Sequence, residues 1–122
     1  MRIAPFAVVL DRWNALEPDV LWLSDARSDR LREDGLHGAP DLVVEVLSPS
    51  TRRRDLGVKL DLYARHGVRE YWLVDPLARN VHVHRWEAGQ VAASQELGPG
   101  ETLHSPLLLG FALPADEVFA GP

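Results

Sequence analysis

The stretch that decides the fold is PDLVVEVLSPST, residues 40–51. Its segment 41–47 carries apolar residues on both faces, which is typical of a central strand that is covered on both sides. Residues 48–51 then break the strand with a proline and offer hydroxyl groups that can cap a helix. The stretch therefore predicts a buried strand that leads through a turn into a helix.

The spacing of apolar residues after this turn predicts the helix itself. Four of them stand at i, i+4, i+7 and i+8, which is the spacing of one helical face. Gly67 supplies a stop signal for the C-terminus of this helix. The four apolar positions are Leu56, Leu60, Tyr63 and Ala64.

Apolar runs on both sides of this unit predict further strands. Residues 25–38 are charged and indicate a loop or one helical turn, and residues 107–120 form an apolar tail that we expect to pack on the sheet. Strands, one helix and more strands indicate an α/β domain bordering on α+β, with a mixed sheet, over residues 1–122. The expected strands are residues 3–10, 18–23, 41–47, 70–74, 81–86 and 90–97.

Composition limits the class of protein. A chain of 122 residues with 46% hydrophobic and 25% charged residues has an ordinary globular balance, which excludes wholesale disorder. It contains no cysteine, so disulfides, thiolate metal sites and cysteine nucleophiles are excluded. No apolar run approaches the ~20 residues of a membrane span, and the N-terminus shows no signal peptide. We therefore expect a cytoplasmic protein that does not enter a membrane.

The net charge of −5 argues against a broadly basic protein that coats nucleic acid. It leaves open an enzyme that contacts DNA through one local patch. Lys59 is the only lysine, and the other twelve of the thirteen basic residues are arginines. Any role of Lys59 can therefore be tested by changing one residue.

Acidic residues on two of the expected strands suggest a metal site. Asp19 and Asp41 each follow a proline at the start of a strand, and Glu45 lies inside the second strand. A carboxylate there is costly to bury unless it is paired or bound to a metal. Asp19 and Glu45 on neighbouring strands, with the carbonyl oxygen of Val46, would supply oxygen ligands for Mg²⁺. Alternatively, Asp19 is a turn residue and Glu45 pairs with an arginine.

Lys59 can reach the same level of the sheet as Glu45. The strand advances about 7 Å from Glu45 to Leu47, at ~3.3 Å per residue. A helix that starts near Thr51 and returns over the sheet retraces about 12 Å by Lys59, at ~1.5 Å per residue. A lysine at that place can orient a water molecule or stabilise the charge of a transition state. The alternative is an Asp55–Lys59 pair at i, i+4 on the helix surface.

Together, residues 40–51, Asp55, Lys59, Tyr63 and residues 67–76 closely resemble the Uma-type restriction endonucleases, a bacterial family of the PD-(D/E)XK nuclease superfamily. The resemblance extends over about residues 15 to 120. It implies a restriction-endonuclease-like, three-layer fold with a mixed central sheet. It also implies a nuclease that hydrolyses DNA phosphodiester bonds with Mg²⁺ or Mn²⁺.

The resemblance assigns roles to particular residues. It places the first acid of the superfamily at Asp19 and the second at Glu45, with Asp41 as a rival for the first position. The superfamily's usual lysine two residues after the second acid is replaced here by Leu47. Lys59 on the following helix then resembles a lysine that has migrated to a new position.

This chain differs from the family it resembles in the length of its N-terminal region. Family members have a longer region before the first Pro-Asp strand, whereas seventeen residues precede Pro18 here. We therefore expect part of the N-terminal layer to be missing and the exposed sheet to be covered by a second copy in a homodimer. The alternative function is an inactive nuclease-fold remnant that serves as an oligomerisation or DNA-binding module.

Overall fold

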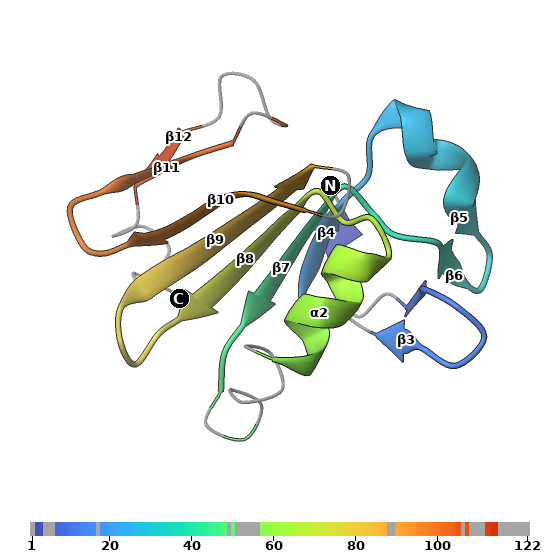
Figure 1. Cartoon of the computed structure of the whole chain (residues 1–122), viewed down its shortest axis with the longest axis horizontal. Helices are drawn as coiled ribbons and strands as arrows, with labels where there is room; N and C mark the ends of the chain where they lie inside the picture. The colour runs from blue at the N-terminus through green and yellow to red at the C-terminus, as the bar shows by residue number, and fades with distance from the viewer. Residues whose placement is uncertain are drawn as a thin grey trace.

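The computed structural model describes residues 2–3, 7–16, 18–48, 50, 57–87, 90–105, 107 and 112–114. Within them, six strands form a mixed central sheet in the order β1–β4–β7–β8–β9–β10 (Figure 1). Strands β7 and β8 are parallel, and the other neighbours in this sheet are antiparallel. The six strands are β1 (Arg2–Ile3), β4 (Val20–Trp22), β7 (Leu42–Val46), β8 (Glu70–Asp75), β9 (Asn80–Glu87) and β10 (Gln90–Leu97).

Helix α2 (Val58–Arg65) lies between β7 and β8 in the chain. Two parallel strands need such a crossover, because the chain must return along the sheet before the second strand starts. The helix ends at Arg65, just before the stop signal that the sequence predicts at Gly67, whose φ of 93° is a backbone conformation that glycine adopts easily. The described helix begins at Val58, and the predicted start near Thr51 lies outside the described residues.

Two smaller sheets accompany the central one. A four-stranded sheet has the order β3–β2–β6–β5, and β11 pairs with β12 as a two-stranded sheet. Residues 25–38 are therefore more ordered than predicted, because they form the 3₁₀ helix η1 (Asp25–Arg30) and the hairpin β5–β6. The bounds are β2 (Val8–Val9), β3 (Ala15–Leu16), β5 (Leu31–Arg32), β6 (Gly35–His37), β11 (Thr102–His104) and β12 (Ala112–Pro114).

The single strand predicted over residues 3–10 is wrong. Its described parts are β1, which pairs with β4 of the central sheet, and β2, which pairs with β3 and β6 of the smaller sheet. Of the tail over residues 107–120, the partly buried Leu107 packs against the core and residues 112–114 form β12, while the rest lies outside the described residues.

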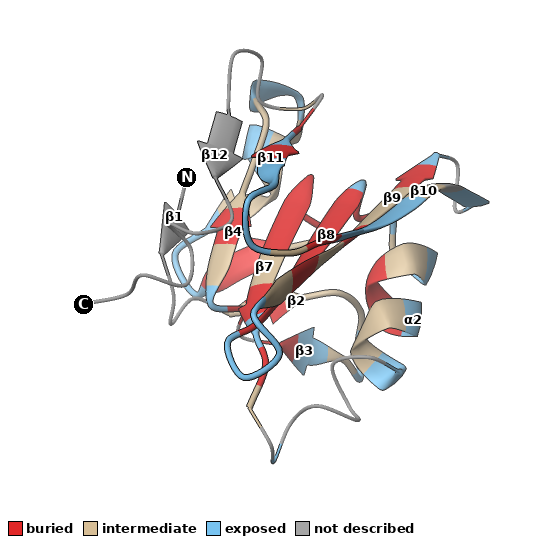
Figure 2. Cartoon of the chain, turned by 90° about the vertical axis from the view of Figure 1, so that its left-hand side faces the viewer, coloured by how far each residue is buried: buried red, intermediate tan, exposed pale blue. Residues whose placement is uncertain are grey.

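The central sheet is covered on both faces, as its sequence predicts (Figure 2). On one face, Val43 and Tyr71 pack with Leu62 and Tyr63 of α2. On the other face, residues that alternate with these, such as Trp72, pack towards β11. The side chain of every second residue of β7 therefore points towards α2, and Glu45 belongs to this set because it lies two residues after Val43.

Most of the large apolar side chains in the described part of the chain are buried, but five are exposed. They lie on five different segments, so they do not by themselves outline one apolar sheet face of the kind expected from the short N-terminal region. No helix within the described ranges has the length and apolar content that crossing a membrane requires. The five exposed residues are Trp13, Val46, Val58, Leu77 and Val91.

Candidate functional site

The antiparallel pairing of β4 with β7 brings Asp19 next to Glu45. Val20 lies opposite Val44, so Asp19, one residue earlier, falls at the position opposite Glu45. The Asp19 side chain is exposed, and its Oδ2 accepts a hydrogen bond from the Val46 backbone N–H at 2.7 Å. This bond fixes the carboxylate at the end of β7, against the segment that carries the second acid.

Lys59 reaches Glu45 from the first turn of α2. The Lys59 ammonium donates to Glu45 Oε2 as an ion pair, and the side chains are 15% and 3% exposed. A carboxylate buried to this degree needs a cation or hydrogen-bond donors to offset its lost hydration. The structure therefore places Lys59 level with Glu45, as the reach of the strand and the helix predicts. Asp55, the alternative partner of Lys59, lies outside the described residues.

Asp41, the rival first acid, lies at the opposite end of β7. It is 1% exposed, and its Oδ2 accepts a hydrogen bond from the Ser24 N–H at 2.7 Å. Its Oδ1 lies 3.3 Å from Arg27 Nε and 3.7 Å from an Arg69 guanidinium nitrogen. The structure thus brings Asp19, Glu45 and Lys59 together, and it leaves Asp41 among arginines about four strand residues away, or roughly 13 Å.

Asp19, Glu45 and the backbone at Val46 form a donor set that suits a hard divalent cation. Mg²⁺ is bound in proteins by one or two carboxylates and completes its octahedron with water and substrate phosphate. In the described part of the chain, no three histidine, cysteine, aspartate or glutamate side chains are close enough to hold a metal by themselves. Two carboxylates on neighbouring strands therefore fit a Mg²⁺ site that water and substrate complete, and they do not fit a closed structural site.

A family model described as "Uma2: Putative restriction endonuclease" matches residues 3–116, which is nearly the whole chain. The chain belongs to the Uma2 family. The match includes all the residues of the site described above. No curated protein matches the chain.

Among solved structures, the chain is similar to a crystal structure described as "a putative nuclease belonging to DUF820 from Anabaena variabilis ATCC 29413". The TM-score is 0.75 at 21% sequence identity, and the match covers 95% of this chain. This likeness confirms the restriction-endonuclease-like fold. With mixed sheets and few helices, the fold class is α+β. The chain covers 65% of the length of that structure.

One buried polar cluster of this Uma2-family chain was not predicted. Glu70, at the start of β8, is 1% exposed and accepts hydrogen bonds from Trp72 Nε1 at 2.6 Å and from the Ser105 hydroxyl at 2.8 Å. Arg85 Nε lies 3.4 Å from the same carboxylate. The cluster joins β8 to the segment that follows β11, on the face away from α2. Ser105 is 35 residues from Glu70, so no local pattern indicates the contact.

Proposed function

We propose that this chain is a metal-dependent DNA endonuclease that hydrolyses phosphodiester bonds at the Asp19–Glu45–Lys59 site. The observation that carries the proposal is the convergence of two elements on one segment of β7. Asp19, just before β4, bonds to Val46, and Lys59 of α2 bonds to Glu45. Membership of the Uma2 family and the nuclease-like fold support the same assignment.

In this proposal Asp19, Glu45 and the Val46 carbonyl oxygen hold Mg²⁺, or Mn²⁺ in its place. A bound divalent ion supplies an activated water molecule and neutralises charge on the phosphate. The short bond from the Val46 N–H keeps the exposed Asp19 carboxylate in place without a cation. The protein thereby orders one ligand before metal and substrate arrive, which lowers the entropic cost of binding them.

Lys59 has two roles in this proposal. Its ammonium offsets the charge of the buried Glu45. From the same position it would orient the attacking water molecule. A fixed cation in a largely buried place stabilises developing negative charge more strongly than it would in water. Because α2 is the crossover between β7 and β8, the helix holds this cation against the sheet.

Plasmid nicking tests the proposed function. Purified protein should convert supercoiled DNA to the open circle with Mg²⁺ or Mn²⁺ and not with EDTA. Asp19→Asn and Glu45→Gln should each lose most of this activity, whereas Arg65→Gln, on the exposed side of α2, should retain it. Absence of nicking by wild-type protein over a range of DNA substrates and both metals would contradict the proposal.

The alternative is an inactive nuclease-fold remnant that acts as an oligomerisation or DNA-binding module. The Lys59–Glu45 ion pair favours it, because a carboxylate that is already neutralised by a protein cation can be a structural element. Wild-type protein that binds DNA but never nicks it, with or without metal, would support this alternative.

Two further properties belong to the proposal. We propose a homodimer, which is the commonest closed oligomer, and a location in the cytoplasm. Light scattering at tens of micromolar protein should give twice the chain mass of 13.6 kDa. A monomer mass would contradict the dimer without bearing on the nuclease site.

A further inference from the structure

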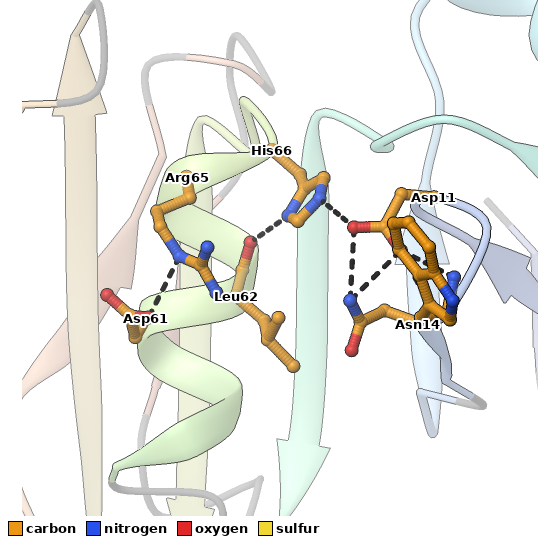
Figure 3. Close-up of polar contacts among 7 residues, drawn as sticks. Asp11, Asn14, Asp61, Leu62, Arg65 and His66 are labelled. Atoms are coloured by element: carbon orange, nitrogen blue, oxygen red, sulfur yellow. Dashed lines mark hydrogen bonds and ion pairs between the residues drawn. The ribbon is translucent and has the colours of Figure 1, made fainter.

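His66, just after the last residue of α2, bridges the helix to the turn between β2 and β3 (Figure 3). Its Nδ1 lies 2.7 Å from the Leu62 carbonyl oxygen, and its Nε2 lies 2.8 Å from Asp11 Oδ2. The His66 side chain is 19% exposed, so both contacts are partly shielded from water. The imidazole therefore links two segments that are 55 residues apart in the chain.

Both partners of the His66 ring are hydrogen-bond acceptors. A neutral imidazole has one N–H donor and one acceptor nitrogen, so it can satisfy only one of the two. The imidazolium has two N–H donors and can satisfy both. Its positive charge is also favourable beside the Asp11 carboxylate and at the C-terminal end of a helix. The geometry thus selects the protonated ring.

The charged groups around His66 are few. Asp11 faces it from the β2–β3 turn, and no other charged side chain within the described ranges forms an ion pair with the ring. On its own helix, Asp61 and Arg65 pair with each other at 2.9 Å, with side chains 68% and 61% exposed. Figure 3 shows this second pair on a different side of the helix from the His66–Asp11 contact. Within the described ranges, Asp11 is therefore the charged partner of His66 in this bridge.

Lys59 and His66 lie on the same face of α2. They are seven residues apart, which is nearly two turns, or ~10 Å along the axis. Leu62 and Tyr63, the buried residues of the helix, lie between them. One face of α2 is thus held to the protein by an ion pair at each end, to Glu45 of β7 near its start and to Asp11 after its end.

We propose that the His66 imidazolium is a positioning group, which fixes the end of α2 against the β2–β3 turn and thereby holds Lys59 on Glu45. When His66 loses its proton, one of its two bonds is lost and that end of the helix is released. The Lys59–Glu45 contact then opens more often. A role in catalysis rests on the proposed function, but the coupling between the two ends of α2 does not.

The first test uses the protonation state of His66. Imidazole ¹⁵N chemical shifts should show both ring nitrogens protonated in the wild type to a higher pH than in Asp11→Asn. The asparagine amide can donate to Nε2 of a neutral ring while Nδ1–H still donates to Leu62, so Asp11→Asn should favour the neutral form. An unchanged titration of His66 in Asp11→Asn would overturn the bridge.

The second test measures how readily Lys59 is exposed, using its rate of acetylation by acetic anhydride. As the only lysine, it is separated from the N-terminal amine by peptide mapping. At pH 6, His66→Gln should raise the rate by roughly tenfold over wild type, which corresponds to losing one charge-assisted hydrogen bond that resists local opening. At pH 8 the ratio should be smaller, because any loss of the ring proton removes one of its two hydrogen bonds.

The matched control is Arg65→Gln, which removes the neighbouring surface ion pair and should leave the Lys59 rate unchanged at both pH values. Equal rates in His66→Gln and wild type at pH 6 would overturn the positioning role. Neither measurement requires DNA cleavage. An inactive wild-type protein would therefore contradict the proposed function and leave this inference to be decided separately.

Discussion

The two ends of β7 each hold a buried carboxylate, in different surroundings. Asp41, before the strand, is 1% exposed and meets a backbone N–H and two arginines. Glu45, inside the strand, is 2% exposed and meets a lysine from a separate helix, with the exposed Asp19 carboxylate beside it. Asp41 ties three segments together, whereas at the Glu45 end two acids and a cation gather next to solvent.

This difference distinguishes a structural acid from a candidate catalytic one. Burial alone does not, because both carboxylates are almost fully buried. Two carboxylates side by side repel each other and lower stability. Such pairs are typical of functional sites, for example sites that bind a metal ion. The two ends of β7 should therefore differ in whether a substitution there alters activity, stability or metal binding.

The largest expected effect is on cleavage by Lys59→Ala. Loss of a fixed cation beside the reacting phosphate should lower the rate by a hundredfold or more, or about 3 kcal/mol of transition-state stabilisation. Single-turnover nicking with Mn²⁺ measures this, and circular dichroism checks that the variant is folded. A variant that cleaves like the wild type would show that Lys59 serves only to neutralise Glu45.

Matched amide substitutions compare the stability of the two ends. Asp41→Asn should lower the free energy of unfolding by about 2 kcal/mol, because its amide donor must face either the Ser24 N–H or an arginine. Glu45→Gln should cost about 1 kcal/mol or less, since the amide oxygen can still accept from Lys59. Urea denaturation measures both. A larger cost for Glu45→Gln would make Glu45 the structural acid.

Metal binding should depend on the Glu45 end only. Mg²⁺ or Mn²⁺ at ten times its Kd should stabilise the wild type by about 1.4 kcal/mol, because the ion binds the folded state. The same addition should leave Tm unchanged in Asp19→Ala, whose metal ligand is gone, and should still raise it in Asp41→Asn. Differential scanning calorimetry with each metal provides the measurement. A metal-induced shift that survives Asp19→Ala would place the ion elsewhere.

Local pattern was enough to predict the centre of the fold. The expected strands at 41–47, 70–74, 81–86 and 90–97 correspond to β7, β8, β9 and β10, because runs of apolar or alternating residues report burial directly. The N-terminal strands were predicted less well. β2, β3 and β5 have only two residues each, and such strands form through tertiary pairing and leave little periodicity in the sequence.

The candidate site was predicted in part. Asp19, Glu45 and Lys59 were singled out from their residue types and the reach of helix and strand, and they do lie together. Their roles as metal ligands and catalytic lysine remain predictions. Sequence left Asp19 and Asp41 as rivals, since each follows a proline before an apolar run. Only the register of β4 against β7, a long-range property, shows which one is next to Glu45.

The smallest expected effect concerns Asp11. Its carboxylate accepts hydrogen bonds, as those of Asp41 and Glu45 do, but it lies at the surface. Hydrogen bonds from the Trp13 backbone N–H and the Asn14 side chain, which hold the β2–β3 turn, lower the pKa of Asp11 from 3.8 to about 2. Because the native state favours the ionised form, the stability that Asp11 contributes is present above pH 3.8 and is lost as the pH falls towards about 2.

This acid dependence can be isolated with Asp11→Asn. Urea denaturation between pH 5 and pH 2 should show that the free energy of unfolding falls slightly more steeply with falling pH in the wild type than in the variant. The reason is that Asp11 takes up a proton on unfolding in this range and asparagine does not. The difference should be small because the turn is exposed. Identical slopes for the two proteins would mean that Asp11 is not engaged by the turn, and the anchor we infer for His66 would then be less rigid.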